Sequence, residues 1–449
     1  MFTLSKVQVS GSCPGVAEVR RVKGSRFAVR VRRSFNLAAV AMALNSLDGL
    51  AQVDAKKSGD PDSVLSNLPV VLLETKEVIT PDRERKAKCA VKIVGPQLDR
   101  RSNLGPLPGV VRIHGGVSQS YPKKSFALTL DAPAQLLDLR EHSHWVLNAA
   151  YIDRSLMRHK LAYDLFRSLS TPNTARFAAA SRFVEVYLNG SYNGAYLLME
   201  RVDRQLLQLR GFQSNDLAHS CIYKAVDHSA NFGAPGHNGF EQREPDSAVL
   251  AYWKPLERFN RFVSSVSDAE FFDGGHGIGA RLDLDNAIDF HLLVLLTCNL
   301  DGITKNFILA RNGFASNSPP ARFFFAPWDY DGTFGRNWDA TPVLPTVWLS
   351  NHLFDRLLAN RNYLERFAAR WEQLRRKEFS VRTIQELIEA NARALGDAAH
   401  RNAARWPVST GGYPDQLSFS EDIAQMKQWA DRRVKWLDQE ILRLMSRTK

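Results

Sequence analysis

Cysteine is scarce in this sequence of 449 residues, and what there is lies widely scattered. The four cysteines are Cys13, Cys89, Cys221 and Cys298, and they form no C-x-x-C pair and no cluster with histidine. Zinc sites and disulfide frameworks need closely spaced thiols. The sequence therefore gives little support to a zinc module or a disulfide-stabilised scaffold. Cys298, at the end of an apolar run, is expected to be a small core residue.

Long apolar runs and internal repeats are also absent. No stretch approaches the ~20 apolar residues that a membrane-spanning helix needs, so we expect no membrane span. Hydrophobic residues make up 44% and charged residues 24% of the chain, which is ordinary for a soluble globular protein. The length is sufficient for a large core and predicts two or three structural units.

The positive charge of the chain is not spread evenly. The net charge is +12, but residues 1–33 alone hold eight Lys or Arg and one acid, Glu18. The remainder is only mildly basic and lacks a dense Lys/Arg block, which favours a solvated surface over a nucleic-acid interface. We therefore expect no nucleic-acid partner.

The amino-terminal segment, residues 1–51, is not expected to belong to the main fold. Arg32-Arg33-Ser34-Phe35 resembles a twin-arginine export signal, and Leu37–Leu44 is a short apolar stretch after it. A disordered basic tail is the competing interpretation. An export signal would place the protein in the exported or cell-envelope fraction, whereas a disordered tail would leave it in the cytoplasm. Residues 52–67 are polar and are predicted to be a linker.

A carboxylate and an amide stand five positions apart just before a predicted strand. Asp301 is followed by Asn306, and Phe307–Arg311 has the composition of a strand. This spacing alone is common, and such residues more often cap helices or form turns. However, a capped apolar helix is predicted over roughly residues 286–298. A buried helix ending there would hold Asp301 rigidly.

Two further aspartates follow a second strand-like run. Arg322–Ala326 leads to Asp329 and Asp331, just before a Thr-Phe-Gly sequence. Protein kinases use this order of parts: a catalytic Asp, a metal-holding Asn, two strands and a metal-binding Asp before Phe-Gly. Phosphoryl transfer needs a carboxylate to orient a hydroxyl and oxygen ligands to hold Mg²⁺ on the phosphates. The candidate catalytic residue is thus Asp301, with Asn306, Asp329 and Asp331 as candidate metal ligands.

A glycine-containing segment lies upstream, at Arg112-Ile113-His114-Gly115-Gly116. Glycines let backbone N–H groups approach phosphates closely, so Gly115, Gly116 and the nearby Ser118 are candidate nucleotide contacts.

The lysine predicted to contact phosphates is Lys124. It begins the alternating run Lys124–Leu130 and shares its face with the apolar residues of that strand. The alternative is an exposed lysine whose stem covers apolar surface. Lys123 is the second candidate for this role and Lys224 a more distant third.

A helix and a hairpin complete the pattern. Asp153-Arg154-Ser155 is predicted to cap a helix of about fifteen residues with a core-facing stripe at every fourth position. Phe183–Leu188 and Tyr192–Leu198 are predicted to pair through Asn189-Gly190, a favoured type I′ turn. The second strand runs into Glu200.

Together these segments resemble the CotH kinase family, whose namesake is spore coat protein H. The resemblance is carried by residues 111–130, 145–167 and 183–203 and by the two motifs LDGITKNF and PWDYDGTFG. It implies an α+β, two-lobed, protein-kinase-like fold. The mainly β N-lobe would occupy residues 68–203 and the mainly helical C-lobe residues 204–449.

The resemblance also implies chemistry. ATP with Mg²⁺ or Mn²⁺ would bind between the lobes, with the base near Glu200, and the phosphoryl group would pass to Ser or Thr of a protein, including the chain itself. Two features depart from ordinary kinases: the predicted helix offers no Glu to pair with the lysine, and Asn299-Leu300 replaces His-Arg before Asp301. Two alternatives therefore stay open, a non-catalytic pseudokinase or structural coat protein, and a small-molecule or sugar kinase.

Overall fold

The computed structural model describes residues 6–9, 15–22, 26–30, 66–80, 85–95, 105–211, 218–314, 321–407 and 416–447. The chain forms two compact units, Met1–Gly59 and Asp60–Lys449. In the first, β1 (Lys6–Val9), β2 (Gly15–Val22) and β3 (Arg26–Arg30) form an antiparallel sheet. The predicted export signal at Arg32-Arg33 lies outside the described residues, as does almost all of the predicted linker.

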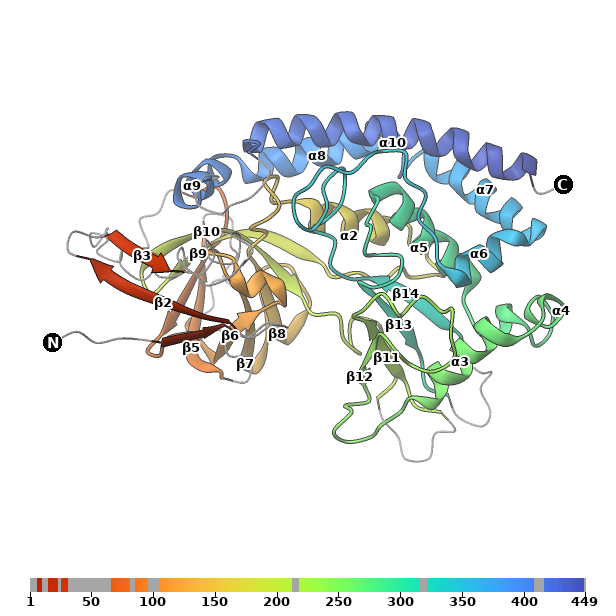
Figure 1. Ribbon diagram of the computed structural model, residues 1–449, viewed down its shortest axis with the longest axis horizontal. Coiled ribbons are helices and arrows are strands. Elements are labelled where there is room, and N and C mark those ends of the chain that lie inside the picture. The colour runs from red at the N-terminus through yellow and green to blue at the C-terminus, as the bar shows by residue number, and fades with distance from the viewer. Residues whose placement is uncertain are drawn as a thin grey trace. The chain divides into compact units, whose positions relative to one another are not determined.

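The second unit mixes strands and helices, so the fold class is α+β (Figure 1). Its strands are β4 (Val70–Thr75), β5 (Ala87–Val94), β6 (Leu107–His114), β7 (Ser125–Gln135), β8 (Glu141–Asn148), β9 (Ser181–Leu188), β10 (Ser191–Glu200), β11 (Cys221–Ala225), β12 (Phe240–Glu244), β13 (Phe307–Arg311) and β14 (Phe323–Pro327). Its α-helices are α2 (Arg158–Ser168), α3 (Lys254–Ser265), α4 (Asp268–Phe271), α5 (Leu284–Thr297), α6 (His352–Ala359), α7 (Arg361–Arg375), α8 (Val381–Leu395), α9 (Asp397–Arg405) and α10 (Phe419–Arg447). Among the described residues, no helix is both long enough and apolar enough to cross a membrane.

Seven of these strands close into a barrel in the order β10-β8-β7-β6-β5-β4-β9. The pairs are antiparallel except β4 with β9, which run parallel. Every second residue points inward, as the alternation of a pleated strand requires, and Val111, Ile113, Phe126 and Leu128 belong to the buried interior. The sequence predicted a mainly β segment here but not its closure.

The β9–β10 hairpin confirms the turn prediction. Asn189 and Gly190 have φ values of 50° and 75°, as a type I′ turn requires. β9 begins two residues before its predicted start. β10 begins one residue earlier and ends two residues later than predicted, at Glu200.

A second sheet has the order β12-β11-β13-β14, with all neighbours antiparallel. The predicted strands Phe307–Arg311 and Arg322–Ala326 are β13 and, shifted by one residue, β14. They pair with Phe307 opposite Pro327. This register brings the residues just before β13 beside those just after β14.

The apolar helix predicted before Asp301 is α5. The Asp283 carboxylate caps its first turn by accepting from the N–H groups of Asp285 and Asn286. Nearly every side chain of the helix is buried, and Phe290 stacks on Phe325 of β14 at a centroid distance of 4.7 Å. Cys298 ends the helix in the left-handed conformation, φ 50°, and is buried as expected.

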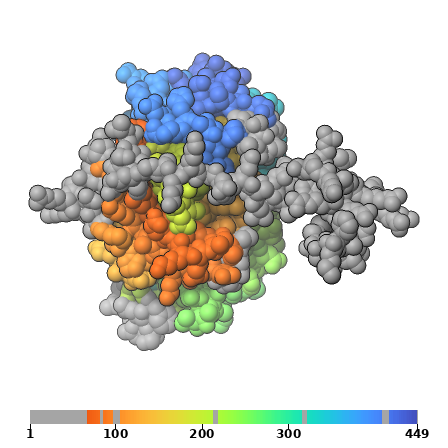
Figure 2. Space-filling view, turned by 90° about the vertical axis from the view of Figure 1, so that its left-hand side faces the viewer, coloured from red at the N-terminus to blue at the C-terminus, as the bar shows by residue number. Residues whose placement is uncertain are grey.

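The C-terminal helices lie above both the barrel and the second sheet (Figure 1). The predicted helix Val381–Ala399 is interrupted at Gly396, where α8 ends and α9 begins. Figure 2 shows the blue atoms of the C-terminal helices above the yellow and orange atoms of the barrel. Two polar contacts hold α9 there. Arg401 forms a bidentate pair with Glu185 of β9, and Asn402 Oδ1 accepts from Lys123 Nζ at 2.8 Å.

One buried residue of α5 should make stability depend on pH. Burial lowers the pKa of His291 to about 4, although its Nε2 lies 2.8 Å from the Leu349 carbonyl oxygen. The unfolded chain binds this proton at about pH 6.5, so the stabilising contribution is complete above that pH and is lost as pH falls towards 4. In His291→Gln, the loss of unfolding free energy over that pH range should be smaller by about 3 kcal/mol. Denaturant unfolding at several pH values measures this, with His276→Gln, at an exposed loop position, as the control. An unchanged pH slope would contradict the assignment.

Candidate active site

The chain leaves α5 through a rigid polar turn that carries Asp301. Asn299 is buried; its Oδ1 accepts from the Gly302 N–H at 3.0 Å, and its Nδ2 donates to the Asp329 carbonyl oxygen at 3.2 Å. Asn299 therefore connects the loop of Asp301 to the loop of Asp329. It stands where ordinary kinases have the His-Arg that this sequence lacks.

Two basic side chains contact the Asp301 carboxylate. Lys305 Nζ lies 2.9 Å from Oδ2, and His228 Nε2 lies 3.5 Å from Oδ1. The Thr304 hydroxyl, 2.7 Å from His228 Nδ1, fixes the orientation of this ring. The Asp301 side chain is only 16% exposed, so its carboxylate is held in place by neighbours rather than solvated as a free surface group.

The β13–β14 register brings Asn306 and Asp329 together. Asn306 precedes β13, and its carbonyl oxygen accepts from the Trp328 N–H at 3.1 Å, next to Asp329. Both residues adopt the left-handed conformation, with φ 59° for Asn306 and 57° for Asp329. Asn and Asp tolerate this region better than other side chains, and such backbone conformations are often found at functional sites.

His159 of α2 is a side-chain partner of Asp329, with Nε2 at 3.3 Å from Oδ1. Tyr163 supports the same residue because its hydroxyl accepts from the Asp329 N–H at 2.9 Å. Burial alone would raise the pKa of Asp329, but the His159 hydrogen bond and the charges of His159, Lys224 and His114 outweigh it and lower the pKa. Asp329 is therefore ionised at neutral pH.

Asp331 has the opposite behaviour. Burial and the negative charge of Asp329 raise the pKa of its carboxyl to about 7, with His159 opposing the change. Two neighbouring carboxyl groups thus compete for limited positive charge. A divalent cation would relieve this competition, so the oxygen donors of Asn306, Asp329 and Asp331 suit a hard cation such as Mg²⁺. Within the described ranges, no group of three or more His, Cys, Asp or Glu side chains is arranged to hold a metal ion, so a cation here would depend on the Asn306 amide, water or substrate oxygens.

Further basic side chains lie around Asp329. Lys224 of β11 places its Nζ 4.5 Å from the centroid of the Trp328 ring, and its charge lowers the pKa of Asp329. Burial is the main reason that the pKa of His114 falls to about 4. The charges of Arg112 and Lys224 also lower this pKa, whereas the charge of Asp329 raises it. His114 ends β6 on the outer face of the barrel, since Val111 and Ile113 of the same strand point inward.

The predicted phosphate contacts are divided between two places. Lys124 has the same strand parity as Phe126 and Leu128, but that face is the inside of a closed barrel. Its Nζ donates to the backbone oxygens of Gln119 and Tyr121, and it lines a cavity of about 500 Å³ with Ile113, Phe126 and Leu188. Lys224, the most distant candidate in the sequence, is the lysine whose charge acts on Asp329.

Gly115 and Gly116 follow His114 directly, so this loop begins next to the basic side chains around Asp329. Gly115 has φ 114°, and a Cβ there would come within 1.9 Å of the Ser118 hydroxyl oxygen, so the turn accepts only glycine. Ser118 lies in the short 3-10 helix that follows (Val117–Ser120).

Glu200 lies elsewhere on the barrel. Its carboxylate accepts from the N–H groups of Arg140 and Ala180 at 3.2 and 3.0 Å and pairs with the Arg140 guanidinium. Both carboxylate oxygens are therefore occupied by internal contacts, and a ligand beside Glu200 would meet backbone rather than a free carboxylate.

Several residues of the site gave no signal in the sequence. They are His114, His159, His228, Asn299 and Lys305. A lone histidine has no spacing pattern, and the partners lie 70 to 170 residues away along the chain, as for His228 with Asp301 and His159 with Asp329. Lys305 alone could have been found, because it lies between Asp301 and Asn306.

The fold and the site define an α+β protein in which carboxylates and lysines gather at the ends of two antiparallel strands. The chain belongs to the CotH family, because the family described as "CotH kinase protein" matches residues 111–437. The chain is also similar to the inner spore coat protein H of Bacillus subtilis (strain 168), with 29% identity over 252 residues. That similarity covers 52% of this chain and 63% of the relative.

Proposed function

We propose that this protein is an atypical protein kinase that transfers the γ-phosphoryl group of ATP to Ser or Thr hydroxyls, its own included. The observation that carries the proposal is that three residues come together. The register of β13 with β14 brings Asn306 beside Asp329, and Asn299 connects the loop of Asp301 to the loop of Asp329. These are the oxygen-bearing side chains that phosphoryl transfer needs: one to orient a hydroxyl and others to hold the metal. The family description, "CotH kinase protein", agrees with it.

The proposed arrangement has two lobes. Residues 68–203 would form the lobe with the barrel, and residues 204–449 the lobe with the second sheet and most of the helices. ATP would lie between the outer face of the barrel at His114 and the loop of Asp329. The Gly115–Gly116 turn would approach the phosphates and the base would lie towards Glu200.

Each residue then has a defined task. The acceptor oxygen attacks the γ-phosphorus, the bond from phosphorus to the bridging oxygen breaks, ADP leaves, and Asp301 receives the hydroxyl proton. Lys305 and His228 orient Asp301. Asn306 and Asp329 would hold Mg²⁺ or Mn²⁺, with Asp331 assisting. A bound metal would neutralise charge on the phosphates.

The phosphate-binding lysine is best assigned to Lys224. Lys224→Gln should raise the ATP concentration for half-saturation about tenfold or more, because a hydrogen bond to a charged group contributes about 1.5–3 kcal/mol. Lys124→Gln is the matched control and should leave that value nearly unchanged, since its Nζ is occupied by two backbone oxygens. Calorimetric titration with a non-hydrolysable ATP analogue and Mg²⁺ measures both. The reverse ranking of the two variants would return the role to Lys124.

The name of the B. subtilis relative favours a second candidate, a structural coat component that keeps the fold without turnover. The two candidates differ in one result. Titration of the full chain with ATP, with and without Mg²⁺, followed by assay for γ-phosphate loss, should give metal-dependent binding and transfer for a kinase. Binding without transfer would support the structural candidate, and no metal-dependent binding would exclude the kinase.

A further inference from the structure

Two consecutive residues at the start of α2 hold the loop Asp329–Gly335 at two points. His159 contacts the Asp329 carboxylate at 3.3 Å. Arg158, one position earlier, donates from Nε to the Thr333 carbonyl oxygen at 2.8 Å. Position and direction of the loop therefore depend on how α2, and Arg158 in particular, is fixed.

Two carboxylates hold the Arg158 guanidinium in place. Its Nη1 lies 2.5 Å from Asp153 Oδ1, and its Nη1 and Nη2 donate to the two oxygens of Asp422 at 2.6 and 2.7 Å. Arg158 and Asp422 are each 1% exposed. A bidentate pair in this environment has a fixed geometry, and loss of either partner leaves the other charge buried.

Asp422 belongs to the first turns of α10, far from Asp329 in the sequence. The same helix contacts the other end of the loop: Gly335 packs so closely on Trp429 that a Cβ would lie 2.8 Å from the indole ring. Trp429 Nε1 also donates to the Val343 carbonyl oxygen at 2.7 Å. Helix α10 thus supports the loop directly at Gly335 and through Arg158 at Thr333.

We propose that Asp422 is a positioning residue that acts through Arg158 to set the loop of Asp329 and thereby its affinity for the metal of the proposed reaction. The inference rests on the proposed kinase function. Asp422 touches neither substrate nor metal. Its effect is to keep the Thr333 carbonyl, and with it the carboxylate of Asp329, at the position that His159 and Asn299 also define.

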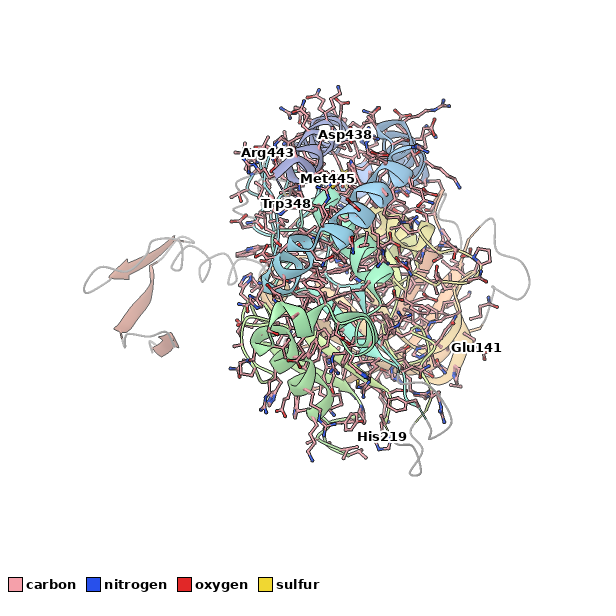
Figure 3. All side chains as sticks on the ribbon, turned by 90° about the vertical axis from the view of Figure 1, so that its right-hand side faces the viewer. Glu141, His219, Trp348, Asp438, Arg443 and Met445 are labelled. Atoms are coloured by element: carbon pink, nitrogen blue, oxygen red, sulfur yellow. The ribbon has the colours of Figure 1, made fainter. Side chains whose placement is uncertain are left out.

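The test compares two aspartates of the same helix. Asp422→Asn replaces one accepting oxygen by an N–H group that faces the Arg158 guanidinium. Asp438→Asn is the matched control: Asp438 pairs with Arg375 and Trp371 away from the loop and lies among the C-terminal helices in Figure 3. The Mg²⁺ concentration for half-maximal phosphoryl transfer should rise on the order of tenfold in Asp422→Asn, as for other residues that orient a metal ligand, and stay unchanged in Asp438→Asn.

Thermal unfolding of both variants separates positioning from a loss of stability, since a structural role alone would lower the melting temperature without changing the Mg²⁺ dependence. Equal Mg²⁺ dependence in the two variants would overturn the inference. A wild-type protein that transfers no phosphoryl group would instead overturn the proposed function.

If Asp422→Asn does not fold, hydrogen exchange in the wild-type protein tests the inference instead. Hydrogen exchange with ATP and Mg²⁺ should slow amides in residues 329–335 and, through Arg158, in residues 419–424. Slowing confined to the loop would contradict coupling to α10.

Discussion

Asp301→Asn is expected to lower phosphoryl transfer on the order of 10²-fold or more while ATP affinity changes little. Asn keeps the shape of the side chain but loses the carboxylate that is proposed to accept the hydroxyl proton. It also loses the ionic contacts of Asp301 with Lys305 and His228. In the proposed site, ATP and metal would still be held by Asn306, Asp329 and Lys224.

The comparison of transfer rate with ATP affinity in this variant decides the role of Asp301. Asp227→Asn, an exposed aspartate that accepts from Ser229 next to His228, serves as the control and should retain normal transfer. Transfer near the wild-type rate in Asp301→Asn, or an equal loss of binding and transfer, would count against a catalytic carboxylate. Asp301 would then be a helix-end residue that Asn can replace.

Removal of the Asp329 carboxylate should have the largest effect, abolishing metal-dependent nucleotide binding and therefore transfer. Asn is the better substitute than Ala, because Asp329 has φ 57° and Asn tolerates this conformation. Asp329→Asn should also keep a hydrogen-bonding partner for His159. The thermal shift produced by ATP with Mg²⁺ measures the loss.

Asp339→Asn is the control for this experiment. Asp339 lies in the loop that follows and accepts from the Thr341 N–H and hydroxyl, so its variant should keep the full thermal shift. An Asp329→Asn protein with an unchanged shift and normal transfer would remove Asp329 from the site.

The order of parts around Asp301 and Asp329 could be predicted because it depends on local sequence. The β13 and β14 strands are short apolar runs bounded by polar loops, and α5 is a longer apolar segment with a capping Asp. Length, composition and flanking residues therefore locate these elements. Their antiparallel pairing then places Asn306 beside Trp328, next to Asp329. Local signals therefore located the helix and the two strands that carry these residues, and the catalytic and metal-binding roles of the carboxylates remain predictions.

The surroundings of the candidate lysines could not be predicted from local sequence. Lys124 directly precedes β7 and Lys224 lies on β11. Alternation tells which residues share a face of a strand but not what that face contacts. Closure of the barrel turned the face of Lys124 inward, and closure depends on the parallel pairing of β4 with β9, more than 100 residues apart. Lys224 lies beside Trp328 only because β11 pairs with β13.

The start of α2 illustrates the same limit. Asp153 was predicted to cap a helix of about fifteen residues, whereas α2 begins at Arg158 and has 11. The Asp153 carboxylate does accept from the Arg158 N–H at 2.7 Å, but it also pairs with the Arg158 guanidinium. The third member, Asp422, is 264 residues away, so the buried network has no local signature.

Incubation of the full chain with γ-labelled ATP and Mg²⁺ or Mn²⁺, followed by mapping of phosphorylated residues by mass spectrometry, tests the central claim most directly. The chain itself and an unstructured acceptor protein rich in Ser and Thr provide the hydroxyls. The proposed function predicts label on Ser or Thr that depends on added metal and is lost in Asp301→Asn and Asp329→Asn. Metal-dependent ATP binding with no phosphorylated residue on either protein would contradict it.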